Sequence, residues 1–420
     1  MKPKLLTTLK TYTWPLFAAD VFAGVTVAMV ALPLSLAIAI ASGADPAKGL
    51  VTAIVAGFLI SLLGGSRVQI GGPTGAFIVV VYGVIAHHGY DGLVLATLMA
   101  GAILLVAGFF RAGNLIQFIP EAVVNGFTMG IAVIIATSQL KDLLGLQIAN
   151  LPADFLHKLP ALWAARDTLN LFALGTGLAT IGLIVLFRRL APKWPGLIVA
   201  VGLTSAAAVL LAWPVESIAD RFGALPDHLP MPGMPGITFA RLQELLPSAF
   251  VIAFLAGVES LLSAMVADRM IEGRHRPNAE LIAQGAANIG SSLFGGLPAT
   301  GAIARTATNV KAGGKTPVAG IVHAVTILLV MMLAAPLAGE LALPALAGLL
   351  MLTAWNMSEP QKWHEYMTMR VEDRVLLVLT LVLTVVADLT VAIGVGVALG
   401  LALRLRRREV PPADWKTPKR

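Results

Sequence analysis

Two charged residues lie within apolar stretches of the sequence that are long enough to be buried in a membrane. Glu259 falls near the middle of the apolar run 246–267, and Arg305 lies in the short run 299–311. A charged side chain at the centre of a bilayer costs a few kcal/mol, so each residue is a candidate for a functional site. Arg305 is expected to offset the charge of a bound anion. The alternative is a static salt bridge with Glu259.

Two glycine- and proline-rich breaks interrupt the apolar sequence and resemble each other. The first contains Gly64-Gly65 and Gly72-Pro73-Thr74-Gly75-Ala76, and the second runs from Gly295 to Ala302. Paired breaks in the two halves of a membrane protein indicate a binding site between repeats, whereas the alternative is two loops that share small residues. Two helix N-termini facing each other at mid-membrane would attract an anion. The expected anion-binding residues at these breaks are Thr74, Gly75, Ala76, Gly301, Ala302, Ile303, Ala304 and Arg305.

The composition is that of an integral membrane protein. Of the 420 residues, 57% are hydrophobic and 13% are charged, and the mean hydropathy is +0.83. Apolar runs of about 20 residues are long enough to span a bilayer as helices, which predicts an all-α membrane fold. Fourteen such segments are expected, at 20–42, 48–63, 70–86, 92–110, 115–139, 168–187, 195–213, 246–267, 279–297, 299–311, 317–337, 341–357, 374–388 and 389–404.

Segments 70–86 and 299–311 are too short to cross alone and are expected to be half-helices. The proline-rich connection 214–245 marks the expected repeat boundary. This divides the chain into a first repeat at 1–213, the loop 214–245, a second repeat at 246–408 and a cytoplasmic tail at 409–420.

Charge and residue usage exclude several classes of protein. Basic residues gather near both ends, which predicts cytoplasmic termini and contact with lipid headgroups rather than with nucleic acid. The sequence has no cysteine, and its seven histidines show no metal-ligand spacing, so no metal site is expected. No pairing of a nucleophile with a base stands out, so the protein is not expected to be an enzyme.

Several stretches resemble the SulP family, the sulfate permeases. They are Asp20, Gly24, Pro33, Ala37, Ala39 and Gly43, the Gly72-Pro73 break, Gly257–Leu262 with Ala267-Asp268, Asn278–Gly285, Asn288, Gly295–Pro298, Arg305-Thr306 and Ala312–Thr316. The resemblance covers about residues 15–405. It implies seven plus seven segments in an inverted repeat, with a core domain (segments 1–4 and 8–11) that moves against a gate domain (segments 5–7 and 12–14). Most members continue into a cytoplasmic STAS domain, whereas about a dozen residues follow the arginine cluster here.

The resemblance also implies roles for individual residues. Arg305 matches the family's anion-site arginine, and Leu34 and Ile38 match positions that line the anion pocket. Glu259 matches an acid that is linked to cation coupling, where glutamate goes with protons and aspartate with sodium. Ser260 and Ser263, on adjoining turns, are expected to be able to hydrogen-bond this carboxyl group.

The expected function is secondary active transport of a small inorganic or organic anion such as bicarbonate, sulfate or a dicarboxylate. Proton-coupled symport by an elevator-like movement is the first choice. A sodium-coupled bicarbonate symporter and an uncoupled anion channel or exchanger are the alternatives. The protein is expected as a homodimer in the cell's inner membrane, with no cofactor other than, in the alternative, Na⁺ as coupling ion.

Overall fold

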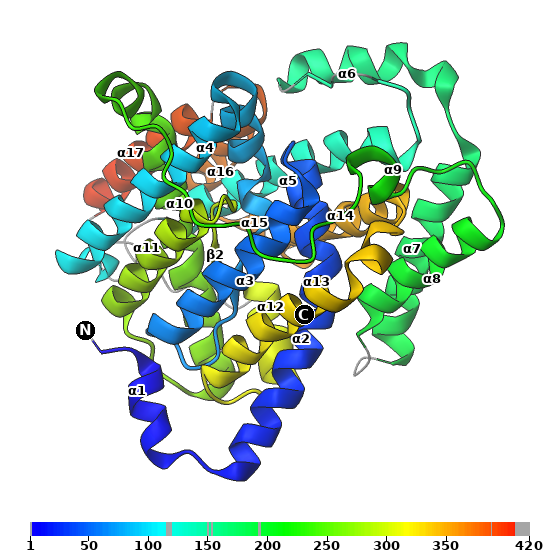
Figure 1. The fold of residues 1–420 in the computed structure, drawn as a ribbon. Helices are drawn as coiled ribbons and strands as arrows, with labels where there is room; N and C mark the ends of the chain where they lie inside the picture. Colours follow the sequence, from blue (N-terminus) through cyan, green and yellow to red (C-terminus); the bar gives the residue numbers. More distant parts are fainter. Residues whose placement is uncertain are drawn as a thin grey trace.

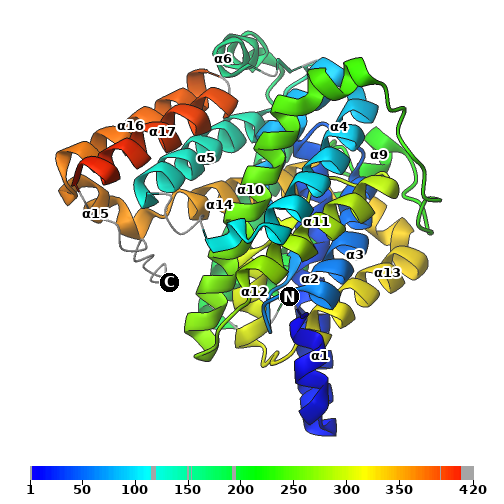
Figure 2. The same ribbon diagram turned by 90° about the vertical axis from the view of Figure 1, so that its left-hand side faces the viewer.

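The computed structural model describes residues 2–114, 120–148, 151–152, 154–191, 195–387 and 389–407. The described chain is mostly helical, and its long helices form two groups that lie side by side (Figure 1, Figure 2). Seven described helices are long and apolar enough to cross a membrane. The expected tail 409–420 lies outside the described residues.

The first group, called the central group, holds the two breaks. Its helices are α2 (Trp14–Ala41), α3 (Pro46–Leu63), α4 (Ile78–Phe109), α10 (Phe239–Ile271), α11 (Pro277–Leu293), α12 (Ile303–Lys311) and α13 (Val318–Gly339). Helix α11 packs against α3 and α4, and α13 packs against α2 and α3. The short strands β1 (Gly71–Gly72) and β2 (Thr300–Gly301) lie within this group.

The second group, called the flanking group, packs mainly around α5 and α14. It comprises α5 (Glu121–Leu143), α7 (Leu171–Leu190), α8 (Gly196–Leu210), α14 (Leu343–Met357), α16 (Val371–Val386) and α17 (Leu389–Arg407). Short helices and 3₁₀ turns connect the elements: α1 (Lys4–Thr8), η1 (Leu9–Thr11), η2 (Gly75–Phe77), η3 (Ala112–Asn114), α6 (Phe155–Ala164), η5 (Arg166–Thr168), α9 (Ile218–Phe222), η6 (Pro360–Lys362) and α15 (Trp363–Thr368).

Both apolar segments that were expected to be half-helices form short helical pieces. Helix α12 has nine residues. Helix α4 is interrupted at Gly89, whose φ of 69° and ψ of 178° are not helical. The first part of α4 is therefore a short helix that begins at the first break, through η2. A residue with a side chain rarely adopts this backbone conformation, whereas glycine, which has no Cβ atom, can adopt it.

The two breaks meet directly. Strand β1 pairs antiparallel with β2, so that Gly71 lies opposite Gly301 and Gly72 lies opposite Thr300. The pairing places the start of η2 and α4 next to the start of α12, although the 227 residues from 73 to 299 lie between the two strands in the sequence. Two short helices from distant parts of the chain thus begin from one small piece of sheet.

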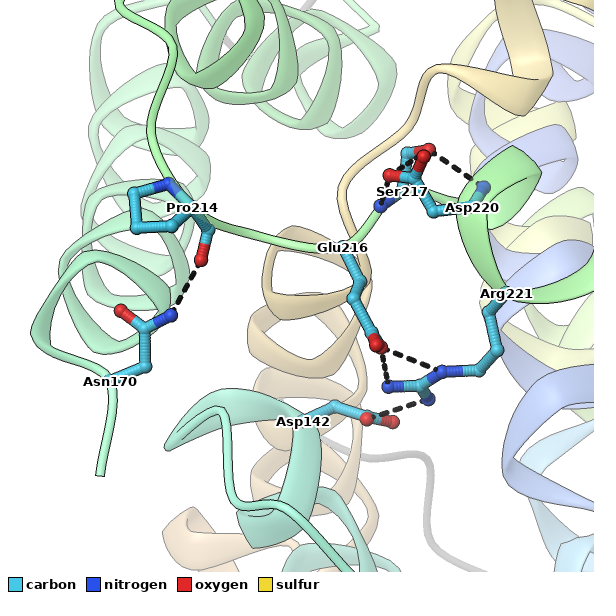
Figure 3. A network of polar contacts seen from close by, with 7 residues as sticks. All are labelled: Asp142, Asn170, Pro214, Glu216, Ser217, Asp220 and Arg221. Atoms are coloured by element: carbon cyan, nitrogen blue, oxygen red, sulfur yellow. Dashed lines mark hydrogen bonds and ion pairs between the residues drawn. The ribbon is translucent and has the colours of Figure 1, made fainter. Parts of the chain in front are cut away.

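A separate polar network ties the segment after α8 to Asp142 near the end of α5 and to Asn170 at the start of α7 (Figure 3). Arg221 of α9 donates from Nη1 to Oδ1 of Asp142 at 2.8 Å and from Nε to Oε2 of Glu216 at 2.9 Å. Two backbone bonds join the same segment to the junction of α13 and α14. The backbone N–H of Leu343 donates to the carbonyl of Glu216 at 2.9 Å, and the backbone N–H of Ile218 donates to the carbonyl of Leu341 at 3.0 Å. These bonds hold the link between the central and flanking groups in one geometry.

Candidate functional site

Arg305 is buried beside the paired breaks and is only partly hydrogen-bonded. Its side chain, in the first turn of α12, is 1% exposed. The Nη2 group donates to the hydroxyl of Ser35 in α2 at 3.1 Å, while Nε and Nη1 have no hydrogen-bond partner in the described structure. A buried donor without an acceptor is costly, and guanidinium groups bind oxyanions through such donors. The side chain is therefore suited to receive an anion.

The position of Arg305 depends on the absence of a side chain at Gly72. A Cβ atom there would lie 2.4 Å from Nη1 of Arg305, and the φ of Gly72 is 151°. Glycine at this position therefore gives the guanidinium group access to the backbone of the first break. Arg305 belongs to the second break in sequence but lies against the first in space.

Glu259 contacts the other side of the first break. Its Oε2 atom accepts a hydrogen bond from the hydroxyl of Thr74 at 3.0 Å, and Thr74 immediately precedes η2. Among the described residues, Glu259 forms no ion pair with Arg305 or with any other basic residue. The static salt bridge considered as an alternative is thus not what the structure shows. The carboxyl group instead lies at the start of the first short helix.

This helix start faces the flanking group. A Cβ atom on Gly75 would lie 3.1 Å from Sδ of Met357 in α14 and 3.6 Å from Cδ1 of Ile135 in α5. Ala76, the next residue, is buried at 3% exposure. The backbone at Gly75 is therefore at the boundary between the two helix groups.

The second break is more tightly filled than expected. A Cβ atom on Gly301 would lie 1.6 Å from Nε2 of Gln69, and the backbone N–H of Ala302 already donates to the carbonyl of Ile70 at 2.8 Å. Gly301 and Ala302 were expected to let a ligand approach the backbone, but they pack against the first break. Ile303 is partly exposed and Ala304 exposed at the start of α12.

Ser260 and Ser263 do not contact Glu259. Ser260 donates to Oε1 of Glu280 at 3.0 Å, and Ser263 shares a hydrogen bond of 3.2 Å with Thr306 of α12. Both serines point away from Glu259, toward elements that hold the breaks in place. The expectation that they hydrogen-bond the Glu259 carboxyl was wrong, because the Ser260 hydroxyl donates to another carboxyl group, that of Glu280, and the Ser263 hydroxyl pairs with that of Thr306.

On the α2 side, Arg305 hydrogen-bonds Ser35 and not the predicted Leu34 and Ile38. Leu34 and Ile38 pack in the apolar core, whereas Ser35, between them, supplies the hydroxyl that touches Arg305. Ser35 also donates to the carbonyl of Ala31 at 2.7 Å. A serine in an apolar helix gives little signal, because serines often bond the backbone one turn back.

Two further buried polar residues lie outside the expected set of site residues. Glu280 of α11 is fully buried and accepts from the backbone N–H groups of Gly65 at 2.8 Å and Ser66 at 3.2 Å. His323 of α13 is fully buried, and neither ring nitrogen has a hydrogen-bond partner in the described structure. The signal that could have found Glu280 was a lone acid in a predicted apolar segment, the same signal that singled out Glu259.

No group of three or more His, Asp or Glu side chains that could hold a metal ion occurs among the residues that the structure describes. Polar groups beside the first break include the Arg305 guanidinium near Gly72, the Thr74 hydroxyl and the Glu259 carboxyl that Thr74 bonds. This arrangement can bind an oxyanion next to a carboxyl group that is held by one hydroxyl.

Two bacterial transporters are similar to this chain in sequence. The putative sulfate transporter YvdB of Bacillus subtilis is 43% identical over 375 residues, which cover 88% of this chain and 70% of the relative. The bicarbonate transporter BicA of Picosynechococcus is 33% identical over 341 residues, covering 79% of this chain and 60% of the relative. These relatives are named as transporters, so the expectation of a non-enzymatic protein is confirmed.

Solved structures share the fold. The transmembrane domain of a cyanobacterial bicarbonate transporter BicA superposes with a TM-score of 0.81 at 30% identity, covering 93% of this chain and 98% of that domain. A murine Solute Carrier 26 family anion transporter gives a TM-score of 0.87 at 18% identity, covering 96% of this chain and 71% of that one, which shows likeness of fold alone. Residues 17–380 match the profile of the sulfate permease family. The chain belongs to the sulfate permease family.

Proposed function

We propose that this protein is a secondary active transporter of a small oxyanion, with bicarbonate, sulfate and small dicarboxylates as the candidate substrates. The observation that carries the proposal is the Arg305 side chain, which is 1% exposed and has two nitrogens without a partner beside the paired breaks. The names of the relatives, sulfate and bicarbonate transporters, point to the same class of substrate.

The surroundings of Arg305 favour an anion that is small. Leu34 and Ile38 provide apolar packing on the α2 side, and the fully buried Thr300 and Gly301 close the second break. Recognition would therefore rest on the guanidinium group and on N–H groups at the starts of the two short helices. A compact oxyanion can use such donors without further polar side chains.

We assign Glu259 to cation coupling, with a proton as the first choice. The one side-chain hydrogen bond to its carboxyl group in the described structure comes from Thr74. A proton needs no additional ligands, whereas a hard metal cation takes several oxygen ligands. Sodium coupling is the second choice and requires backbone carbonyl groups to complete the site.

The two helix groups suggest how the site would move. In this proposal the central group acts as the core domain and the flanking group as the gate domain, a division supported by the packing of the helices. Because Thr74, Glu259 and Arg305 all belong to the central group while Gly75 faces the flanking group, an elevator-like shift would carry the whole site along that boundary. An inverted repeat of seven plus seven segments, a homodimer, location in the inner membrane and cytoplasmic termini complete the proposal.

The test is uptake of labelled sulfate, bicarbonate and succinate into proteoliposomes, with imposed pH and sodium gradients in separate experiments. We expect uphill uptake of at least one anion when the pH gradient alone is present. The variant Glu259→Gln should still exchange that anion at equal pH but lose accumulation driven by the gradient. Accumulation that persists in this variant with its pH dependence intact would reject proton coupling through Glu259. Accumulation that follows the sodium gradient instead would favour sodium coupling.

A further inference from the structure

Helix α6 brings a buried lysine to the boundary between the two helix groups. Figures 1 and 2 place α6 at the end of the molecule opposite α1. Lys158 points inward from this helix and is 2% exposed. A lysine is almost never fully buried unless it is paired, so its partners are informative.

The partners of Lys158 carry no opposite charge. Its ammonium nitrogen donates to the hydroxyl of Ser138 in α5 at 2.8 Å and lies 5.5 Å from the ring centroid of Tyr82 in α4. Asp154, at the N-cap of the same helix, pairs with the ring of His157, and no described carboxylate forms an ion pair with Lys158. The lysine is therefore a buried cation held by a hydroxyl group and an aromatic face.

These contacts join the two helix groups. Tyr82 belongs to the central group, and its phenol also donates to the carbonyl of Leu151 at 2.6 Å, in the segment before α6. Ser138 belongs to the flanking group. A movement of one group against the other would break the bonds at Tyr82 and expose the Lys158 ammonium group.

The contacts also lie in line with the candidate site. Tyr82 lies on the first part of α4, eight residues beyond Thr74, which immediately precedes η2. The helical residues between them correspond to a rise of about 12 Å. An anion that reached Thr74 and Arg305 from the α6 end along this helix would pass Tyr82 and Lys158.

We propose that Lys158 closes the anion path at the α6 end, and that its ammonium group is the first binding group for a small oxyanion once Tyr82 releases it. This inference rests on the proposed function. In the closed state the ammonium group is held by Tyr82 and Ser138, and in the open state it faces the incoming anion. Lys158 therefore joins the two helix groups in the closed state and binds the anion in the open state. Its contacts with Tyr82 and Ser138 are called the latch.

The balance between the closed and open states should depend on pH in a definite direction. Burial lowers the pKa of Lys158 from its ordinary value of 10.5 to about 8, against a smaller opposing effect of Asp154. The groups that face it from α5 and α4 are the hydroxyl of Ser138 and the phenol of Tyr82. Exposure would restore the ordinary pKa, so the closed state binds fewer protons than the open state between pH 8 and 10.5. Raising the pH through this window favours the closed state, while below about 8 no dependence is expected.

The experiment is exchange of labelled sulfate in proteoliposomes at equal pH on both sides, so that coupling through Glu259 does not enter. We compare Lys158→Gln, Lys158→Arg and the control Lys48→Gln, because Lys48 stacks on Tyr90 at 5.2 Å within the central group and does not bridge the groups. Lys158→Gln should raise the KM for sulfate about tenfold, the equivalent of one charge-assisted hydrogen bond. Lys158→Arg and the control should stay within twofold of the unmodified protein.

Chemical modification of a cysteine variant distinguishes the loss of the positive charge from a loss of anion exchange caused by misfolding. The sequence has no cysteine, so Lys158→Cys offers a single thiol. An aminoethyl thiosulfonate reagent that restores the positive charge should restore the KM, whereas a sulfonatoethyl reagent should not. The KM of the unmodified protein should rise between pH 8 and 9.5, and that of Lys158→Arg should not.

The outcomes separate the two proposals. An unchanged KM in Lys158→Gln, or equal rescue by both reagents, would overturn the role of Lys158 and leave the proposed function intact. If the unmodified protein exchanges none of sulfate, bicarbonate and succinate, the proposed function falls, and the inference falls with it.

Discussion

The two breaks of the central group are fastened to the same helix by different chemistry. Glu280 of α11 accepts from the backbone N–H groups of Gly65 and Ser66, whereas Asn288, two turns further along α11, donates to and accepts from the backbone of Ala299 at 2.9 Å in both directions. A carboxylate accepts several donors at once, while an amide matches one donor and one acceptor. The first break thus depends on a buried acid and the second on a neutral pair.

The ends of the breaks differ as well. At the first, Gly75 faces Met357 across the boundary between the groups. At the second, Gly301 is covered by Gln69, and Arg305 lies in the first turn of the helix that follows. Similar backbone breaks therefore differ in their surroundings: the first presents a helix start to the boundary between the two groups, and the second is followed by a buried positive charge.

The largest effect on stability should come from the acid that holds the first break. Glu280→Ala would leave the N–H groups of Gly65 and Ser66 and the hydroxyl of Ser260 without their acceptor, at about 1–3 kcal/mol for each buried donor. Asn288→Ala removes its bonds to Ala299 and to the carbonyl of Gln284, but it leaves a single buried donor, the backbone N–H of Ala299, without an acceptor, and it should cost less. Apparent melting temperatures in detergent compare the two variants, and a greater loss in Asn288→Ala would contradict the difference drawn between the breaks.

Alanine substitutions at Gly301 and Gly75 should have different effects, the first lowering stability and the second slowing anion exchange. Gly301→Ala would collide with Gln69 and should cost about 1–3 kcal/mol by overpacking, with part of the loss restored by Gln69→Ala. Gly75→Ala meets the flexible end of Met357 and should leave the melting temperature nearly unchanged while slowing anion exchange. Equal melting temperatures in both variants would show that the second break is not closed by Gln69.

The smallest effect is expected at Ser35. Ser35→Ala removes the one side-chain hydrogen bond of Arg305, which is worth about 0.5–1.5 kcal/mol. Anion affinity should fall by roughly two- to tenfold because the guanidinium group is less well positioned. Leu34→Ala and Ile38→Ala serve as matched controls on the same helix, and a larger loss of affinity in either would assign recognition to the apolar wall.

Much of the helical layout could be predicted from the sequence because it depends on local composition. Helices lie over the expected apolar segments wherever the structure describes them, and the breaks at 64–76 and 295–302 precede short helices. Gly89, which interrupts α4, falls in the expected gap between segments 70–86 and 92–110.

The partners inside the site could not be predicted, because they join residues far apart in the chain. The bond between Glu280 and Gly65 spans 215 positions, and that between Thr74 and Glu259 spans 185. Which hydroxyl bonds which acid depends on helix rotation and packing, which no local pattern encodes. Ser260 was therefore assigned to Glu259, whereas it bonds Glu280.

The central claim is that Arg305 binds the transported anion, and equilibrium binding tests it most directly. Titration calorimetry with the purified protein measures the dissociation constant of the anion that the uptake panel selects, for the unmodified protein and for Arg305→Met, which keeps much of the side-chain volume. A lost charge-assisted bond of about 1.5–3 kcal/mol predicts weakening of roughly 10- to 100-fold, with the melting temperature maintained. An unchanged dissociation constant in the folded variant would contradict the account.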